Sequence, residues 1–568
     1  MFCCKGGIFI FKKRIRHLQR YRDIVFAFSR YGFGYIAIEL GLYDILSLPK
    51  RVFTREAPKE PVQTTEERVR LFLEELGPTF IKLGQFASTR ADILPAELLK
   101  ELEKLQDNVP PFSSEEAIQI VEYELGDTVD ALFGDFNENP LAAASIGQVH
   151  NAVLKTGESV AIKIQRPNIR EKIFADLEIL QDLASLAEHQ LEWAARYQLK
   201  DIIKEFSRSL RAELDYTNEG LNAEKIANQF KKQSNVRIPE IYWDYTTKQV
   251  LTMEFIHGTK LNKEQALIDR HINLDVFAKR LVDTMFHQIF IEGFFHGDPH
   301  PGNIMVMPGE EVVLIDFGSV GRLSPDMKKH LSSFVIALMR QDTERLIKAI
   351  NHMGIIPHDV DMQQLRADID LLREKYYDVP LSQVSLGDAI NDLFTVTYYH
   401  HIHLPSDLAL LGKTLLTIEG IVTRLDPKLS IVKMAEPFGK QLIKERYHPK
   451  KIADHLLGDI GEYTEVVSDL PETIKELRSI IKNGKVRFEL NIPGLNQTLK
   501  KLDQISNRLS FSIVLLSFSI IMTGLIVGSA IIRQSNVLWN VPVIEVGFVV
   551  ATLMFLWILY GIFRSGRF

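Results

Sequence analysis

The chain has 568 residues, of which 46% are hydrophobic and 25% are charged. This ordinary globular composition excludes a disordered, collagen-like or disulfide-rich chain. The net charge of -6 argues against nucleic-acid binding, which normally leaves a basic footprint. Two adjacent cysteines, Cys3 and Cys4, exclude a disulfide framework and a cysteine-based zinc site, and the sequence does not decide whether they are modified.

Residues 1–60 form a basic and partly apolar segment. One interpretation places its cations against anionic lipid head groups, and the other makes them the solvated face of a helix. The cations in question are Lys12, Lys13, Arg14, Arg16, Arg20 and Arg22. The apolar run IFIF is too short for a secretory signal.

Residues 61–130 are predicted to be a helical extension. The stretch TTEERVRLFLEELGPTFIKLGQFASTR, which starts at Thr64, has apolar residues at helical spacing. A further helix is predicted to begin at Ser113 or Ser114, because Glu115 and Glu116 follow.

Residues 131–258 are predicted to be a lobe with strands and inserted helices. The stretch VHNAVLKTGESVAIKIQ has two alternating apolar runs around Lys155-Thr156-Gly157-Glu158, which is typical of a hairpin. Another strand is predicted within 248–256, and a long helical stretch covers 170–231.

Residues 259–445 are predicted to be a second lobe, followed by a linker over 446–508. One strand is predicted within 310–318, and helices are predicted at 273–293, 326–353, 360–376 and 405–424. Helices, then a small sheet, then more helices indicate an α+β fold.

The C-terminus contains two uncharged stretches, from Leu509 to Ile532 and from Val546 to Phe563. The first is long enough to cross a ~30 Å hydrocarbon core. Residues 509–563 are therefore predicted to form two transmembrane helices, with two buried core helices as the alternative.

The orientation of the predicted hairpin follows from the basic residues that flank it. Both of its ends are expected in the cytoplasm, because the flanking residues are Lys500, Lys501, Arg508, Arg564 and Arg567. The predicted location is the inner or plasma membrane, multi-pass, with the preceding domain cytoplasmic. Gly524 and Gly528 would let this hairpin pack closely or form a homodimer.

Four segments contain the residue types that phosphoryl transfer from ATP requires. They are Ala142 to Val149, the strand Val160-Ala161-Ile162-Lys163, the run His296 to Asn303, and Asp316-Phe317-Gly318 after an apolar strand. The chemistry needs a lysine for the phosphates, oxygen ligands for Mg²⁺, and an aspartate to orient the acceptor. Asp298 and Asn303 are five residues apart, as in the protein-kinase pattern, and a DFG sequence follows.

With three further stretches, these segments resemble the UbiB/AarF (ADCK/Coq-type) family of atypical protein-kinase-like proteins. Lys82-Leu83-Gly84-Gln85 matches the family's K-x-G-Q motif, Ala142 to Val149 its alanine-rich loop, and Glu213-Leu214-Asp215 its E-x-D motif. The resemblance covers roughly residues 20–445. It implies a bilobal protein-kinase-like fold with a helical N-terminal extension, and the C-terminal hairpin is common in bacterial members.

The resemblance also implies roles for single residues. Lys163 would bind the α- and β-phosphates, with Glu213 or Glu219 as its partner, and Asp298 would be the catalytic aspartate. Asn303 and Asp316 would hold Mg²⁺, and backbone groups near Glu254 would contact adenine. The nucleotide-binding set is Ala142, Ala143, Ala144, Ser145, Ile146, Gly147, Gln148, Val149, Lys163, Glu219, Glu254, Lys82, Gln85 and Glu213. His296 is expected to make a buried hydrogen bond in the catalytic loop.

The chain departs from an ordinary protein kinase at three places. Ala142 and Ala144 replace two phosphate-loop glycines, which keeps the backbone from its closest approach to phosphate. Gly297 replaces the arginine of the H-R-D motif, and no A-P-E sequence follows the DFG. The K-x-G-Q helix is expected to cover the place of a peptide substrate.

The expected function is that of an ATP- and Mg²⁺-dependent kinase-like ATPase supporting ubiquinone-type biosynthesis by handling lipid precursors. The alternatives are a small-molecule, lipid or protein kinase and a nucleotide-binding scaffold without turnover. Expected partners are membrane lipids, isoprenoid quinone precursors and quinone-biosynthesis proteins, with no nucleic acid.

Overall fold

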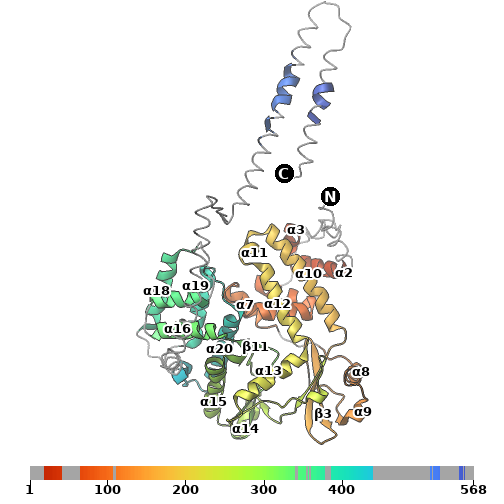
Figure 1. The fold of residues 1–568 in the computed structure, drawn as a ribbon, viewed down its shortest axis with the longest axis vertical. Coiled ribbons are helices and arrows are strands. Elements are labelled where there is room, and N and C mark those ends of the chain that lie inside the picture. The colour runs from red at the N-terminus through yellow and green to blue at the C-terminus, as the bar shows by residue number, and fades with distance from the viewer. Residues whose placement is uncertain are drawn as a thin grey trace, which may run out of the picture. The chain divides into compact units, whose positions relative to one another are not determined.

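The computed structural model describes residues 18–40, 64–105, 110–339, 343–353, 360–377 and 385–435, with a few isolated positions between and beyond them. The chain divides into two compact units, Met1–Asp454 and His455–Phe568. The helices and strands named below all belong to the first unit (Figure 1).

A group of helices precedes the first strand. They are α2 (Leu18–Arg30), α3 (Gly34–Glu39), α5 (Thr65–Leu76), α6 (Pro78–Ala87), α7 (Ala96–Leu102), α8 (Ser114–Leu125) and α9 (Val129–Leu132). Helix α5 begins at a capping box, in which Thr64 Oγ1 accepts from the Glu67 N–H and a Glu67 carboxylate oxygen accepts from the Thr64 N–H. Ser113 caps α8, so the helix start predicted there is confirmed.

The first sheet is antiparallel, with strand order β1-β3-β4-β6 and β2 paired to β3. Its strands are β1 (Phe133–Phe136), β2 (Ala142–Ala143), β3 (Gly147–Leu154), β4 (Ser159–Gln165) and β6 (Val250–Glu254). The predicted hairpin between β3 and β4 is confirmed, and its turn uses Gly157 at φ +100°, a conformation that favours glycine. Helix α8 packs Ala117 and Val121 against one face of this sheet.

The helical stretch predicted over 170–231 is a series of helices rather than one. It contains α10 (Ile169–Gln190), α11 (Glu192–Arg196), α12 (Leu199–Glu213) and α13 (Tyr216–Gln229). Helix α13 contacts both β6 and β8 and so bridges the first sheet and the strands of the second lobe.

The second lobe contains two small sheets. One has the order β5-β10-β9-β7, and the other pairs β8 with β11. The strands are β5 (Val236–Arg237), β7 (Thr259–Lys260), β8 (Phe294–His296), β9 (Ile304–Met307), β10 (Glu311–Leu314) and β11 (Val320–Arg322). A short 3₁₀ helix, η2, covers Trp243–Tyr245.

The remaining helices complete this lobe. They are α14 (Glu264–Asp269), α15 (Leu274–Phe286), the π-helical turn η3 (His287–Glu292), α16 (Pro325–Met339), α17 (Thr343–Met353), α18 (Met362–Tyr377), α19 (Leu386–Tyr399) and α20 (Ser406–Leu425). The sheets are antiparallel except for the parallel pair β5–β10, and their combination with helices confirms the α+β class.

The structure gives Arg20 a role that neither interpretation of the N-terminal cations included. Its guanidinium donates to both carboxylate oxygens of Asp176, at 2.7 and 3.0 Å, and to the Leu76 carbonyl at 2.6 Å. Asp176 is fully buried in α10 and also accepts from Thr79 Oγ1 at 2.6 Å. Arg20 therefore fastens α2 to α5 and α10. The four cations before residue 18 lie outside the described residues.

The predictions for the C-terminus are corrected. Most of residues 509–532 and 546–563 lie outside the described residues, and the longest helical stretch described there covers only 516–524. Within the described positions of the chain, no helix is long and apolar enough to cross a membrane. Because a spanning helix needs ~20 apolar residues, the transmembrane hairpin is unsupported and the predicted multi-pass membrane location is contradicted.

Candidate active site

Lys163 on β4 lies between two carboxylates that come from distant parts of the chain. Its Nζ donates to both oxygens of Glu219 on α13, at 2.9 and 2.8 Å. The same nitrogen lies 3.7 Å from Oδ1 of Asp316, which follows β10. Of the two glutamates considered for Lys163, the structure therefore pairs it with Glu219.

These three groups differ in burial and in charge. Lys163 and Glu219 are buried, whereas the Asp316 side chain is half exposed. The ammonium of Lys163 lowers the pKa of Asp316 to about 2. Burial alone would lower the pKa of Lys163, because it disfavours the charged ammonium. The negative charges of Asp316 and Glu219 outweigh this effect and raise the pKa well above its ordinary value. Burial raises the pKa of Glu219 to about 7, although Lys163 acts in the opposite direction.

The residues around Glu219 hold helix α13 in place. Asp215 caps the helix by accepting from the Thr217 N–H at 3.2 Å, which gives the E-x-D aspartate a structural role. Asn222, one turn beyond Glu219, donates to the carbonyl of Phe317 at 3.1 Å. The Phe317 ring is buried. Helix α13 is thus tied to the DFG segment, where Asp316 adopts a left-handed conformation with φ +64°.

The alanine-rich loop is a tight hairpin between β2 and β3. Ala142 pairs with Val149, Ala143 pairs with Gln148, and the Ala144 N–H donates to Gly147 O at 2.7 Å. A Cβ atom on Gly147 would lie 2.4 Å from Tyr216 Oη and 2.6 Å from Ile164 O. A glycine is therefore required here, even though alanines occupy the two earlier positions.

Two side chains of the loop are held by the protein itself. Ile146 belongs to the hydrophobic core. Gln148 is buried, accepts from the Phe112 N–H at 3.1 Å and contacts a ring nitrogen of His150 at 2.9 Å. Any nucleotide contact at these positions would therefore use the backbone. Ser145 differs, because its buried Oγ has no hydrogen-bond partner among the described residues.

The segment from His296 to Asn303 is held by its own hydrogen bonds. His296 Nδ1 accepts from the Asp298 N–H, and its Nε2 contacts the Ile315 carbonyl, both at 3.1 Å. The predicted buried hydrogen bond of His296 is confirmed, and burial lowers the pKa of the ring. Asn303 Nδ2 donates to Asp298 O at 3.2 Å, and the Ile315 N–H donates to Asn303 O at 3.0 Å. Asn303 and the DFG segment are thereby brought next to each other.

Helix α20 packs directly against this segment. Thr414 Oγ1 donates to the Gly297 carbonyl at 3.1 Å, and a Cβ on Gly297 would lie 2.8 Å from Leu410 Cδ2. A larger residue at the arginine position of the kinase motif would therefore require the side chains of Leu410 and Ser319 to move. The same helix places Lys413 Nζ 3.8 Å from Asp298 Oδ1. No sequence pattern marked this lysine, which lies in an ordinary amphipathic helix far from the motifs.

The K-x-G-Q helix, α6, reaches the same region. Lys82 Nζ lies 2.7 Å from Glu213 Oε1, and its charge also contributes to the lowered pKa of Asp316. The K-x-G-Q and E-x-D motifs are thus joined by an ion pair. Gln85, in contrast, donates to the Leu105 carbonyl at 3.2 Å.

The strand end predicted to contact adenine has few free donors. The Glu254 N–H donates to Glu240 O at 2.8 Å, and the Phe255 N–H donates to Ser159 O at 3.0 Å. The Glu254 carboxylate pairs with Arg237. Of the N–H groups of Glu254, Phe255 and Ile256, only that of Ile256 makes no described hydrogen bond, so it is open to a ligand.

The residues present fit Mg²⁺, which prefers oxygen ligands. Asp316 is held ionised, and Asn303 uses its amide nitrogen for Asp298 O, which leaves its amide oxygen as a ligand. Among the described residues no group of three or more His, Cys, Asp and Glu side chains gathers as a metal site.

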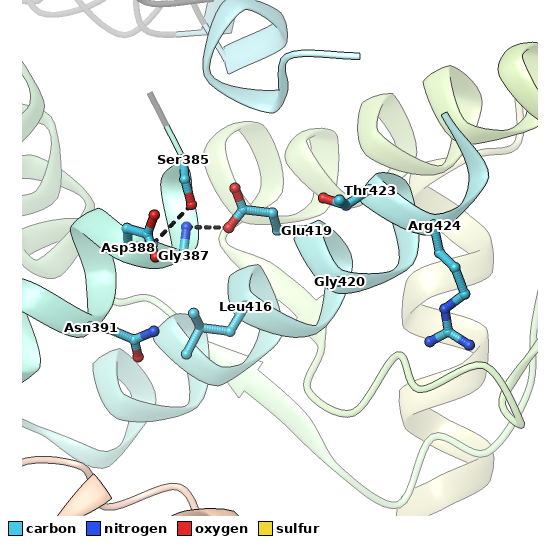
Figure 2. Close-up of a pocket in the computed structure, with 9 residues that line it drawn as sticks. All are labelled: Ser385, Gly387, Asp388, Asn391, Leu416, Glu419, Gly420, Thr423 and Arg424. Atoms are coloured by element: carbon cyan, nitrogen blue, oxygen red, sulfur yellow. Dashed lines mark hydrogen bonds between the residues drawn. The ribbon is translucent and has the colours of Figure 1, made fainter. Parts of the chain in front are cut away.

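A separate cavity of about 680 Å³ lies between α19 and α20 (Figure 2). Glu419 points across it to the start of α19, where its carboxylate accepts from the N–H groups of Leu386 and Gly387. The cavity is lined by Ser385, Gly387, Asp388, Asn391, Leu416, Glu419, Gly420, Thr423 and Arg424. None of the predicted nucleotide-binding residues lines it.

Comparisons with known proteins agree with this geometry. Models of three protein families match the chain: the ABC1 atypical kinase-like domain over residues 104–350, the UbiB helical domain over 369–430, and the ABC1/UbiB kinase-like C-terminal domain over 493–564.

Related proteins align with this chain over most of their own length. A Clostridium pasteurianum protein, named for its place in the hydrogenase 1 5′ region, is 32% identical over 97% of this chain and 99% of its own. A probable protein kinase UbiB from Azotobacter vinelandii is 36% identical over 73% of this chain and 78% of its own. The solved complex of Rv3197 with erythromycin from Mycobacterium tuberculosis is 23% identical and covers 64% of this chain and 93% of that one. The TM-score of this match is 0.46.

Proposed function

The chain belongs to the ABC1/UbiB family of atypical kinase-like proteins, and from this premise we propose that it is an ATP- and Mg²⁺-dependent phosphoryl-transfer enzyme that supports isoprenoid-quinone biosynthesis. The observation that supports this most directly is Lys163, which contacts Glu219 at 2.8 and 2.9 Å and lies 3.7 Å from Asp316. A kinase site with its phosphate lysine and metal aspartate in place has this arrangement.

In this proposal Lys163 holds the α- and β-phosphates of ATP, and Glu219 orients the ammonium. Asp316 and Asn303 hold Mg²⁺, which when bound neutralises the charge of the phosphates. The alanine-rich loop covers the phosphates with its backbone, and the Ile256 N–H is the donor for adenine. Because Ala142 and Ala144 have a Cβ, the loop holds nucleotide differently from a glycine-rich loop.

Asp298 orients the acceptor. The bond between the γ-phosphorus and its bridging oxygen breaks, and the electron pair leaves with ADP. The acceptor oxygen forms the new bond to phosphorus, and its proton passes to the Asp298 carboxylate. His296 holds the Asp298 backbone and stays neutral, because burial lowers its pKa.

The surroundings of Asp298 favour a small acceptor over a peptide. After the DFG sequence the chain enters β11 within two residues and then begins α16 at Pro325, which leaves little peptide-docking segment. Helix α6 of the N-terminal extension, paired through Lys82 with Glu213 on α12, also brings a positive charge close enough to contribute to the lowered pKa of Asp316. We therefore propose ATP hydrolysis coupled to the handling of isoprenoid quinone precursors, with quinone-biosynthesis proteins as partners.

The fate of γ-labelled ATP tests the proposal. Purified protein is incubated with Mg²⁺ and a lipid extract, beside the Asp298→Asn variant. Label released as inorganic phosphate, and lost in the variant, supports the ATPase. Label on an extracted small molecule would instead identify a small-molecule kinase. Tight nucleotide binding without turnover would overturn the enzymatic function and favour a scaffold.

A further inference from the structure

We propose that Lys413 on α20 is a further catalytic residue, which contacts the terminal phosphate of ATP. This inference rests on the proposed function and extends it to a helix outside the kinase-like segment. Lys413 lies within residues 369–430, which match the UbiB helical domain, and not within 104–350. The helical domain would then complete the active site rather than only support it.

The position of Lys413 is set by rigid contacts. Thr414, the next residue, is fully buried and donates to the Gly297 carbonyl at 3.1 Å. Asp407, at the start of α20, accepts from the Arg322 N–H on β11 at 3.1 Å. Helix α20 is thus bonded to the backbone on both sides of the DFG segment. A side chain that leaves this helix beside Thr414 is held at the catalytic loop.

Lys413 and Asp298 form an ion pair that is longer than a hydrogen bond, so the donors of the ammonium remain open to a ligand. Nζ lies 3.8 Å from Asp298 Oδ1, which is beyond hydrogen-bond range. Among the described residues, Lys413 forms an ion pair with Asp298, and no described hydrogen bond uses its ammonium. Both side chains are partly exposed, Lys413 at 25% and Asp298 at 38%, so a ligand can reach them.

The other two lysines near the site are already engaged. Lys163 is held by both oxygens of Glu219, and Lys82 lies 2.7 Å from Glu213. Asp298 orients the acceptor, so a cation beside its carboxylate lies where the acceptor meets the transferred phosphoryl group. Charge spreads over the equatorial oxygens of that group in the transition state. Lys413 is placed to neutralise it, as an arginine supplied from another element does in GTPases.

The test separates contact with the terminal phosphate from a structural role. The affinities of Mg·ADP and of a non-hydrolysable ATP analogue are measured for the wild type, Lys413→Met and Lys413→Arg, with the exposed Lys428→Gln as the matched control. Turnover of ATP and thermal unfolding are measured on the same samples. In the wild type we expect the analogue to bind more tightly than ADP.

Lys413→Met is expected to reduce the preference for the analogue by about tenfold or more while ADP affinity stays the same. Turnover of ATP by Lys413→Met should fall about 100- to 1,000-fold. Lys413→Arg, which keeps the positive charge, should retain part of the preference for the analogue and part of the turnover. If Lys413→Met prefers the analogue over ADP as strongly as the wild type does, the inference is overturned. It is also overturned if the variant loses ADP and analogue affinity equally and has a lower melting temperature, because the role of Lys413 is then structural. If the wild type binds nucleotide without turnover, the proposed catalysis fails, and the affinity ratio still decides whether Lys413 contacts the phosphate.

Discussion

Lys82 of the K-x-G-Q motif and Glu213 of the E-x-D motif form an ion pair at 2.7 Å, which joins the N-terminal helical extension to the end of α12. Both side chains are mostly buried, at 16% and 24% exposure. The pair places a second positive charge near Asp316, so it contributes to the charge balance of the site as well as to helix packing.

The energy of this pair can be measured by a double-mutant cycle. We expect Lys82→Ala and Glu213→Ala to be coupled by about 1 kcal/mol in the free energy of unfolding, because the contact is partly solvated. Denaturant titration of the wild type, both single variants and the double variant gives this coupling. Additive effects of the two substitutions would show that the pair contributes nothing.

Glu219 gives stability a particular pH dependence. Its pKa is about 7 in the nucleotide-free protein, whereas an unfolded glutamate titrates near ~4.3. Between these pH values the folded chain binds more protons than the unfolded chain. The free energy of unfolding contributed by Glu219 therefore falls as pH rises from about 4.3 to 7.

Denaturant titrations of the wild type and Glu219→Gln at pH 5 and pH 7 measure this effect. We expect the wild type to lose more stability between pH 5 and pH 7 than the variant, which lacks the titrating carboxyl. An identical pH dependence of the two proteins would contradict the raised pKa of Glu219.

Gly147 is required by its neighbours. Because a Cβ would meet Tyr216 Oη at 2.4 Å and the Ile164 carbonyl at 2.6 Å, Gly147→Ala forces a backbone shift. We expect it to lower the free energy of unfolding by about 1–3 kcal/mol. Gly134→Ala in the same sheet is the control, because its Cβ would lie 3.4 Å from the nearest atom and should cost less than about 0.5 kcal/mol. Equal effects of the two substitutions would refute this account of the loop.

Arg20 neutralises a carboxylate that has no access to solvent. Arg20→Met leaves the fully buried Asp176 without its cation, and we expect a loss of about 3 kcal/mol in the free energy of unfolding. Arg30→Met breaks an ion pair with Glu75 in which the arginine is 60% exposed, and we expect a loss below about 1 kcal/mol. Chemical denaturation compares the two variants, and a loss of similar size in both would show that the Arg20 pair has no special role.

The motif residues were predictable because their spacing in sequence reflects local geometry. Asp298, Asn303 and Asp316 lie on short turns beside strands, so a pattern of a few residues identifies them. The choice between Glu213 and Glu219 was not predictable, because it depends on where α13 turns after Asp215. The sequence shows Gly297 as a departure from the kinase motif, but its closeness to Leu410 and Ser319 depends on the packed structure.

Other features had no local signal. Lys413 lies in a helix whose sequence shows only amphipathic spacing, and its approach to Asp298 is a property of tertiary packing. Helix α19 was not predicted from the sequence, and neither were the three-residue strands β8 and β11, which are too short to show a periodicity. The apolar composition at the C-terminus predicted membrane helices, which the described structure does not bear out.

The central claim is that catalysis by Asp298 supports quinone biosynthesis, and the isoprenoid-quinone content of cells tests it most directly. Cells that lack the gene are complemented with the wild type, with Asp298→Asn, or with Lys428→Gln, each at the same protein level. We predict that the wild type and Lys428→Gln restore the quinone content and that Asp298→Asn does not. Full restoration by Asp298→Asn would contradict the claim and leave nucleotide binding without turnover as the protein's role.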